Sequence, residues 1–466
     1  MADKHIRLDS KLSSVAAFWK PDTPDEVTTG NLTVDDDGIH FVTSPKYAKG
    51  SDVRPPDLDR INLTSIPRTA VLHGFFDEGN CTLLQLMVVK HPGLVSYKED
   101  PQSVVSTDYR AVALVSGMHT GDFEDKCIDN ARYTFTSLSE WLITPLNEEW
   151  GEKHITIKVP LEETNVIDFC VAHSRTRIEL KVHHELTTGE ESRSRLTRTV
   201  VFIEVTPAEP ESLSWFVGVG NRLENLFSLL TGTSLGMETL FIYRGQQSGT
   251  VIRKQHEYVR RYEIFDSVRY THPQLAHSVA TWMSESDGFR EIENLLLGVL
   301  RKGKLFVETE FLSLAQALEG FHRATGEEIK LDRAVFKALR KKIENFLEEQ
   351  YVDEETARRV NSAVSFANQT SFRSRLRELC GRLSEDTLTK MKIAPEQFVG
   401  EVVHMRNFFT HAGSSYDEKE EPLRGTELFL LSQKMRALLR GVFLRHLGFP
   451  EDQIAELIIR EATKWK

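Results

Sequence analysis

The sequence predicts an α+β multidomain protein, in which an antiparallel β-rich, sandwich-like N-terminal domain precedes an all-α helical bundle. Three observations support this fold class. The chain has 466 residues, too many for one ordinary domain. Its first two hundred residues alternate short β-branched and aromatic segments with turn signals. From about residue 286 to the end, helical periodicity dominates. We therefore expect a β-rich domain at 1–210, a helical and mixed connecting region at 211–300, and a helical domain at 301–466.

Two hairpins are predicted in the N-terminal part. Segments 30–34 and 38–42 flank an acidic turn with the dipeptide Asp37-Gly38, which favours a tight hairpin. Segments 70–76 and 81–89 flank a second turn at 77–80. Further β-type segments follow at 110–118, 131–137, 154–159, 176–182 and 197–205. So many short strands without long helices between them favour an antiparallel sandwich or a barrel-like sheet.

The periodicity changes near residue 211. Residues Phe216, Leu223 and Leu226 follow a helical spacing, and Gly232 is placed to end that helix. The stretch 236–284 is mixed, and we expect it to extend the sheet. Further helices are predicted to begin near residues 287, 306, 331, 354, 371, 395, 426 and 450.

Composition excludes several classes of protein. The chain carries 58 basic and 69 acidic residues, a formal charge of −11. A protein that coats nucleic acid is usually basic, so any such contact here must come from a local patch. The four cysteines are scattered, which argues against a disulfide framework or a zinc site. The N-terminus has no apolar core for a signal peptide, and the apolar runs are too short to span a membrane. We expect a cytoplasmic protein without membrane contact.

The segment 395–411 predicts a helix with two distinct faces. Its first face carries apolar residues at a helical spacing and is predicted to be buried. These residues are Phe398, Val402, Met405 and Phe409. The second face carries small and polar residues where a solvated helix would normally have lysine and glutamate. These residues are Gly400, His404, Asn407 and His411. Arg406 lies between the two faces.

This residue set suits the cleavage of RNA, whose 2′-hydroxyl is a nucleophile placed beside the phosphodiester. Histidine transfers protons near neutral pH, so His411 is the candidate acid or base. The planar guanidinium of Arg406 matches phosphate oxygens, and Asn407 is suited to orient the histidine or to donate to a phosphate oxygen. His404 is an accessory candidate. This scheme needs neither metal nor cofactor, and the lack of nearby carboxylates disfavours a two-metal mechanism.

The spacing of Arg406 and His411 creates a difficulty. Five residues on an ideal helix turn through about 140° beyond a full turn, so one helix brings the two groups together poorly. Two copies related by a twofold axis would place both pairs in one cleft, and Gly400 would allow close approach. A similar pair, Arg440 and His446, lies on a later helix. There we expect the histidine to be an ordinary residue that complements the helix dipole.

The sequence R-N-F-F-T-H at 406–411 resembles the R-N-x-x-x-H signature of HEPN ribonucleases. Segments 311–323 and 371–379 resemble the helical order of the ApeA-like HEPN domain. Segments 18–24, 72–86 and 133–142 are similar to the domain that precedes HEPN in ApeA proteins. The resemblance implies that the helical domain is a HEPN helical bundle. It also implies that Arg406, Asn407 and His411 match the three motif positions.

The family implies a bacterial anti-phage protein that acts by abortive infection. HEPN toxins act as dimers and cleave RNA without metal, commonly leaving a cyclic phosphate and a 5′-hydroxyl. The expected partners are therefore RNA, a second copy of the chain through the HEPN domain, and a phage-derived trigger sensed by the N-terminal domain. The alternative is a non-catalytic HEPN module that dimerises or binds a nucleotide, joined to a β domain that recognises a partner. An intact Arg-Asn-His set favours the nuclease.

Some residues near these motifs have plainer explanations. Glu319 is a second candidate for the site, although a surface ion pair explains it at least as well. Arg373, Arg375 and Arg377 would suit an RNA backbone, but alternate spacing puts them on different faces of a helix, so we expect ordinary surface charges. We expect His73, in an apolar strand, to be packed rather than a ligand.

Overall fold

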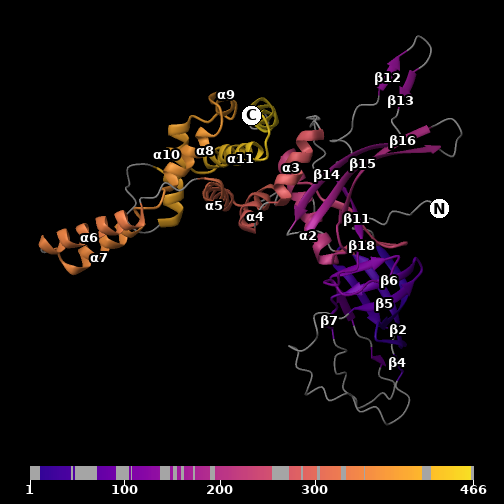
Figure 1. Cartoon of the computed structure of the whole chain (residues 1–466). Helices are drawn as coiled ribbons and strands as arrows, with labels where there is room; N and C mark the ends of the chain where they lie inside the picture. Colours follow the sequence, from indigo (N-terminus) through magenta and orange to yellow (C-terminus); the bar gives the residue numbers. More distant parts are fainter. Residues whose placement is uncertain are drawn as a thin grey trace. The chain divides into compact units, whose positions relative to one another are not determined.

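A computed structural model represents the chain (Figure 1). It describes residues 11–43, 46–47, 71–90, 104–105, 108–136, 147–150, 155–158, 162–171, 174–188, 195–232, 234–253, 272–284, 287–301, 305–326, 332–350, 352–411 and 421–462. The chain divides into two compact units. We call Met1–Phe227 with Leu235–Ser284 the β unit, and Ser228–Ser234 with Glu285–Lys466 the helical unit. The threefold division expected above stays a prediction.

The antiparallel β-rich fold predicted for the N-terminal part is confirmed (Figure 1). Fourteen of the described strands form one continuous sheet in the order β14-β15-β16-β11-β17-β18-β10-β6-β5-β1-β2-β3-β9-β7. Its strands are β1 (Leu12–Lys20), β2 (Thr23–Asp35), β3 (Gly38–Thr43), β5 (Leu72–Phe76), β6 (Gly79–Leu84), β7 (Met87–Lys90), β9 (Asp108–Ala111), β10 (Ala113–Ser116), β11 (Asn130–Phe135), β14 (Glu162–Val171), β15 (Ser174–Thr188), β16 (Arg195–Pro207), β17 (Met237–Arg244) and β18 (Gln247–Arg253). Two small ladders pair β4 (Lys46–Tyr47) with β8 (Val104–Val105), and β12 (Asn147–Trp150) with β13 (Ile155–Lys158).

Both predicted hairpins are present. β2 pairs with β3 and β5 pairs with β6, each in antiparallel register. Gly38 and Gly79 close the two turns as the first residues of β3 and β6, and their φ angles are 139° and 109°. Only glycine adopts such angles without steric cost, which explains why these turn residues are glycines. Turn chemistry thus set the register in both places.

Alternate residues of the first strands meet in one apolar core. Because successive strand side chains point to opposite faces, one face of this part of the sheet is buried and the other is exposed. The core residues are Ala16, Phe18, Leu32, Val34, Ile39, Phe41, Phe76, Cys81, Leu83, Leu86, Ala111, Leu114 and Ile252. Burial raises the pKa of the Cys81 thiol to about 12, so this free cysteine is an inert core residue.

Helix α2 (Leu213–Thr231) covers a later part of the sheet. The buried Tyr133 of β11 donates its hydroxyl hydrogen to the carbonyl of Phe216 at 2.9 Å. Phe135 packs edge-on against Phe227, with ring centroids 5.3 Å apart. Gly232 follows the helix with a φ of 69°, as the sequence predicted for its end.

The mixed stretch 236–284 contains more than the predicted extension of the sheet. Its first part forms β17 and β18, but its last part forms helix α3 (His272–Ser284). The guanidinium of Arg222 donates to the carbonyls of Trp282 and Met283, and the Trp282 indole returns a bond to the Arg222 carbonyl at 2.9 Å. This exchange anchors α3 to α2 within the β unit, a long-range contact that local periodicity does not reveal.

The all-α bundle predicted for the C-terminal part is also confirmed (Figure 1). Its helices are α4 (Asp287–Arg301), α5 (Val307–Thr325), α6 (Arg333–Glu349), α7 (Glu354–Phe366), α8 (Phe372–Gly381), α9 (Glu385–Lys390), α10 (Pro395–His411), α11 (Thr426–His446) and α12 (Glu451–Ala462). Asp332, Asp353, Ser371 and Ser384 cap α6 to α9, each accepting a hydrogen bond from the helix's first turn. The short α9 was not predicted.

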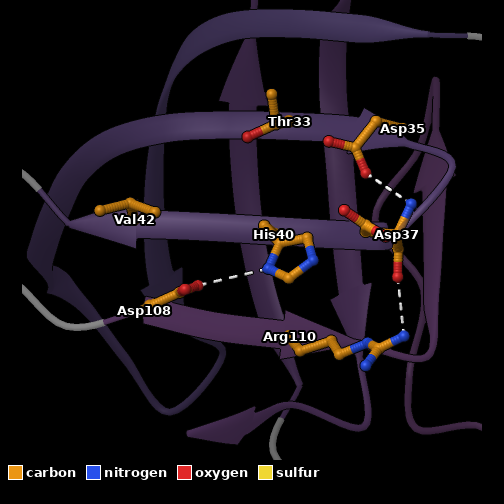
Figure 2. A pocket seen from close by; sticks show the side chains of 7 residues that line it. All are labelled: Thr33, Asp35, Asp37, His40, Val42, Asp108 and Arg110. Atoms are coloured by element: carbon orange, nitrogen blue, oxygen red, sulfur yellow. Dashed lines mark hydrogen bonds and ion pairs between the residues drawn. The ribbon is translucent and has the colours of Figure 1, made fainter. Parts of the chain in front are cut away.

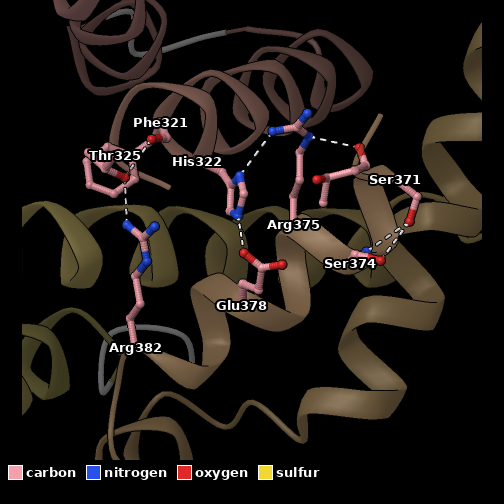
Figure 3. Close-up of polar contacts among 9 residues, drawn as sticks. Phe321, His322, Thr325, Ser371, Ser374, Arg375, Glu378 and Arg382 are labelled. Atoms are coloured by element: carbon pink, nitrogen blue, oxygen red, sulfur yellow. Dashed lines mark hydrogen bonds and ion pairs between the residues drawn. The ribbon is translucent and has the colours of Figure 1, made fainter. Parts of the chain in front are cut away.

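A buried histidine links α5 to α8 (Figure 3). Arg375 is 1% exposed and donates to Nδ1 of His322 at 3.0 Å and to the Thr370 carbonyl at 3.1 Å. Nε2 of His322 then donates to Glu378 at 2.5 Å. The expectation that Arg375 is a surface charge is therefore wrong, because its side chain satisfies polar groups inside the bundle. None of the described helices is both long and apolar enough to cross a membrane.

Candidate functional site

Helix α10 has the buried face that the sequence predicted. Phe398, Val402 and Met405 are at most 1% exposed, and Phe409 is half-buried against Phe311 of α5, with ring centroids 5.7 Å apart. The backbone N–H of Leu423 lies 3.3 Å from the Met405 sulfur, so the chain returns to this helix after its end. These contacts fix which way the rest of α10 faces.

The second face of α10 lies away from this core. Asn407 is exposed, and His404 is half-buried. A Cβ atom added to Gly400 would meet nothing within 4 Å, so this part of the helix surface is open. His411 is the last residue of α10, and its side chain lies outside the described residues. The catalytic roles of Asn407 and His411 stay predictions.

Arg406 is held at the side of α10 by an aromatic ring. Its guanidinium carbon lies 5.8 Å from the ring centroid of Phe372, within the range of a cation–π contact. The side chain is half-buried, and among the described residues no carboxylate forms an ion pair with it. A guanidinium that a ring positions, and that no described carboxylate neutralises, is well suited to bind a phosphate oxygen.

The position of Phe372 follows from how α8 begins and how it packs. Ser371 caps α8 by accepting a hydrogen bond from the backbone N–H of Ser374 at 3.1 Å. Arg377 of α8 forms two hydrogen bonds with Glu396 of α10, at 3.0 and 2.7 Å, which lower the pKa of that carboxyl. The two helices are therefore antiparallel, with Phe372 at the level of Arg406.

Glu319 interacts with its own helix in the structure. It accepts a hydrogen bond from Arg323 at 2.7 Å, and its side chain is 24% exposed. Such a pair one turn apart on a helix surface contributes only a few tenths of a kcal/mol. An accessory role for Glu319 or His404 stays a prediction.

The similar pair on α11 has a structural role. Arg440 is 1% exposed and donates to the carbonyls of Leu229, Leu230 and Leu457, at 2.8, 2.7 and 3.4 Å. His446 stacks on Phe289, with ring centroids 5.3 Å apart. A guanidinium that is buried in this way is not accessible to a phosphate. Burial therefore separates the two Arg–His candidates, which spacing alone did not.

One protein-family model matches most of the β unit, and a second matches most of the helical unit. The family model described as ApeA N-terminal domain 1 matches residues 13–277, more than half of the chain. The chain belongs to the ApeA family. A second model, described as Apea-like HEPN, matches residues 312–453, which include α8, α10 and α11 of the ApeA chain. No curated protein and no solved structure matches it. The two matches support an anti-phage protein with a HEPN domain, and such domains commonly dimerise and act on RNA.

The ApeA N-terminal unit has a polar hollow on the outer face of β2, β3 and β9 (Figure 2). Nδ1 of His40 lies 3.4 Å from the Asp108 carboxylate, and Arg110 donates to the Asp37 carbonyl at 2.7 Å. Thr33 lies on the neighbouring strand, opposite His40. The hollow has a volume of about 570 Å³. No sequence motif points to it, because its residues come from three strands and one turn, and β9 is far from β2 and β3 in the chain.

A second hollow in this unit, of about 740 Å³, contains two stacked histidines. The rings of His73 and His119 are nearly parallel, with centroids 4.6 Å apart. His73 donates to the Thr120 carbonyl at 2.9 Å, and His119 donates to the Gly74 carbonyl at 3.0 Å. The sequence predicted that His73 is packed. In the structure it is half-buried and stacks on a second histidine, which the sequence did not single out. In the described part of the chain, no histidines, cysteines and carboxylates form a cluster suited to a metal ion.

Proposed function

We propose that this chain is a HEPN endoribonuclease toxin of an abortive-infection system, and that it cleaves RNA without metal. The observation that carries this proposal is the position and charge environment of Arg406. It is held on Phe372 without an ion pair among the described residues, beside the exposed Asn407 and near the end of the helix that also carries His411. The HEPN family match and the intact Arg-Asn-His set support the same reaction.

In the proposed reaction, the 2′-oxygen of RNA attacks the adjacent phosphorus and the bond from phosphorus to the 5′-oxygen breaks. The imidazole of His411 accepts the proton of the 2′-hydroxyl, and an acid returns a proton to the leaving 5′-oxygen. The products are a 2′,3′-cyclic phosphate and a 5′-hydroxyl. Arg406 donates hydrogen bonds to the non-bridging oxygens, where negative charge increases in the transition state. Asn407 is suited to orient the imidazole.

The proposed site is completed by a second copy of the chain. Arg406 and His411 diverge by about 140° around an ideal helix, so a twofold partner is needed to bring an arginine of one copy to a histidine of the other. It would also supply the second histidine that acts as the acid. The open surface at Gly400 supports close approach of two α10 helices.

We further propose that the β unit restrains the nuclease or senses a phage-derived trigger, because an unregulated ribonuclease would damage its own host. The two hollows at His40 and at His73 are the candidate recognition sites within this unit. A cytoplasmic location is part of the same proposal, since the RNA that such a toxin cleaves is there.

The decisive experiment is to sequence RNA ends from phage-infected cells that carry either the wild-type protein or His411→Ala. We expect new 5′-hydroxyl ends with wild type and none with the variant. Purified His411→Ala protein that still degrades RNA at the wild-type rate would refute the assignment. Wild-type protein that dimerises but produces no RNA ends would favour the non-catalytic module.

A further inference from the structure

The first half of helix α6 carries an unusual concentration of positive charge. Residues 333–342 contain five basic side chains and no acidic one. These side chains are Arg333, Lys337, Arg340, Lys341 and Lys342. The chain as a whole has an acidic excess and a formal charge of −11, so this is a local reversal of its charge.

Four of these side chains lie on one side of the helix. At 100° per residue, Arg333, Lys337, Arg340 and Lys341 fall within an arc of about 100°, which we call the basic face. From Arg333 to Lys341 it extends about 12 Å along the helix, the length of three to four stacked nucleotides at roughly 3.4 Å each. Lys342 lies outside it, about 150° from its centre. The basic face therefore has the length and charge pattern to follow a short piece of phosphate backbone.

The basic face is accessible and largely unneutralised. Arg333, Lys337 and Lys341 are exposed, and none of the three has an ion pair with a described carboxylate. Arg340 lies 3.7 Å from Glu344, a loose pair one turn away that contributes little in solvent. Within the described part of the chain, these charges are therefore available to a partner.

The fold does not explain the basic face. In α6 only Leu347 is buried, and this helix packs mainly on α7, so the basic side chains support no core. Arg333 lies in the first helical turn, where the helix dipole disfavours a cation. Asp332 already caps this end by accepting hydrogen bonds from Ala334 and Val335 at 2.8 and 3.2 Å. Arg333 therefore gains no stability from its position at this helix end.

The hairpin of α6 and α7 is joined closely to the proposed site. Helix α7 ends at Phe366, and α8 begins at Phe372, the residue that holds Arg406. Six Cα steps separate these residues, so they lie at most about 22 Å apart. A bound RNA strand of ordinary length is long enough to contact both the hairpin and Arg406.

We propose that the basic face of α6 binds the phosphate backbone of the RNA substrate outside the cleavage site. This inference rests on the proposed ribonuclease function and adds a second contact surface to it. Binding through backbone charges is independent of sequence and steeply dependent on salt. The surface would thus favour long RNA over short fragments without selecting a base.

The test measures binding of the full chain to a 2′-O-methyl oligoribonucleotide, which cannot be cleaved because its 2′-oxygen is blocked. The variant Arg333→Gln/Lys337→Gln/Lys341→Gln removes three charges from the basic face. We expect its affinity at low salt to fall at least about tenfold. The slope of log affinity against log salt should also become less steep. Each phosphate that the variant no longer neutralises reduces the slope by roughly 0.7, so the loss of three charges should reduce it by about two.

Two matched variants sharpen this test. Lys342→Gln removes the same charge from the neighbouring residue outside the basic face and should leave the salt slope unchanged, whereas Lys341→Gln should reduce it. Lys337→Arg/Lys341→Arg keeps both charges and should bind as wild type does. An unchanged affinity and salt slope in the triple variant would overturn the inference. If wild type fails to cleave unmodified RNA, the proposed function fails instead, and the binding measurement still decides the role of the basic face.

Discussion

The guanidinium carbon of Arg406 lies 5.8 Å from the centroid of the Phe372 ring, so a residue of α8 positions the arginine of α10. Both helices lie within the segment that matches the HEPN model. An arginine on a helix surface normally samples many rotamers. Contact with a ring reduces this freedom before a phosphate arrives, and pre-organisation of this kind is what a charged group needs to stabilise a transition state.

Replacing Phe372 should therefore slow cleavage without removing it. A cation–π contact at a partly exposed site contributes about 0.5–1 kcal/mol, so we expect Phe372→Leu to lower the single-turnover rate by about two- to fivefold. RNA affinity should change little, and Phe372→Tyr should restore the rate. By contrast, Arg406→Ala should abolish cleavage. A Phe372→Leu variant that weakens only binding would show that the ring contacts RNA rather than positions Arg406.

The arginines of the two Arg–His pairs, Arg440 and Arg406, should differ sharply in how much they contribute to the free energy of unfolding. Arg440→Ala removes the buried guanidinium that donates to the carbonyls of Leu229, Leu230 and Leu457, and leaving one buried polar group unsatisfied costs about 1–3 kcal/mol. We therefore expect a loss of about 3 kcal/mol or more in the free energy of unfolding. Arg406→Ala should change it by less than about 1 kcal/mol. Urea unfolding of both variants decides the matter, and a large loss in Arg406→Ala would make that residue structural.

Much of the architecture could be predicted because local signals control it. The turns at Gly38 and Gly79 need positive φ angles, and periodicity predicted most of the helices. The failures came from long-range contacts. Helix α3 depends on the bonds between Arg222 and Trp282, and the burial of Arg375 depends on His322, 53 residues away.

The same limit applies to the candidate site. Its motif is contiguous, so the sequence could name Arg406 and Asn407. It could not show that Phe372, 34 positions earlier, lies against the arginine, because only the packing of α8 on α10 brings them together. Spacing also could not separate Arg406 from Arg440, which differ in burial.

The link between α5 and α8 should be essential for stability. In Arg375→Ala, Nδ1 of His322 and the Thr370 carbonyl both lose their donor. Breaking one partner of a buried charged network costs about 3–5 kcal/mol, and we expect a loss of about that size in urea unfolding. Arg373→Ala is the matched control, because this neighbouring arginine of α8 is exposed. Equal stabilities of the two variants would contradict the arrangement in Figure 3.

Cleavage should persist when metal ions are removed. The proposed reaction uses an imidazole for proton transfer and a guanidinium for charge, so no step needs a Lewis acid. We expect the same initial rate in EDTA as in buffer with magnesium, after correction for ionic strength. An EDTA-treated protein that loses activity and recovers it only with added metal would point to a different mechanism.

The stacked histidines should make the β unit sensitive to acid. Burial of the His73 ring is the main cause that lowers the pKa of His73. The hydrogen bond from His73 to Thr120 raises this pKa, and the nearby His119 lowers it. In the unfolded chain His73 takes up a proton near its ordinary pKa of about 6.5, whereas the folded chain resists protonation until the pH is lower. Between the ordinary pKa and the lowered pKa, the unfolded state therefore binds more protons than the folded state. The stability that the neutral imidazole contributes is present above about pH 6.5, and it is lost as the pH falls through the lowered pKa.

A difference measurement isolates this effect from other titrating groups, such as Asp122 and Asp125 in the same hollow. The glutamine in His73→Gln is suited to donate to the Thr120 carbonyl but does not titrate. We expect wild type to lose more thermal stability than this variant between about pH 7.5 and about pH 5.5. His119→Gln should reduce the acid sensitivity only in part, because burial is the larger cause of the lowered pKa. If wild type and His73→Gln lose the same stability over this interval, protonation of His73 is not coupled to unfolding.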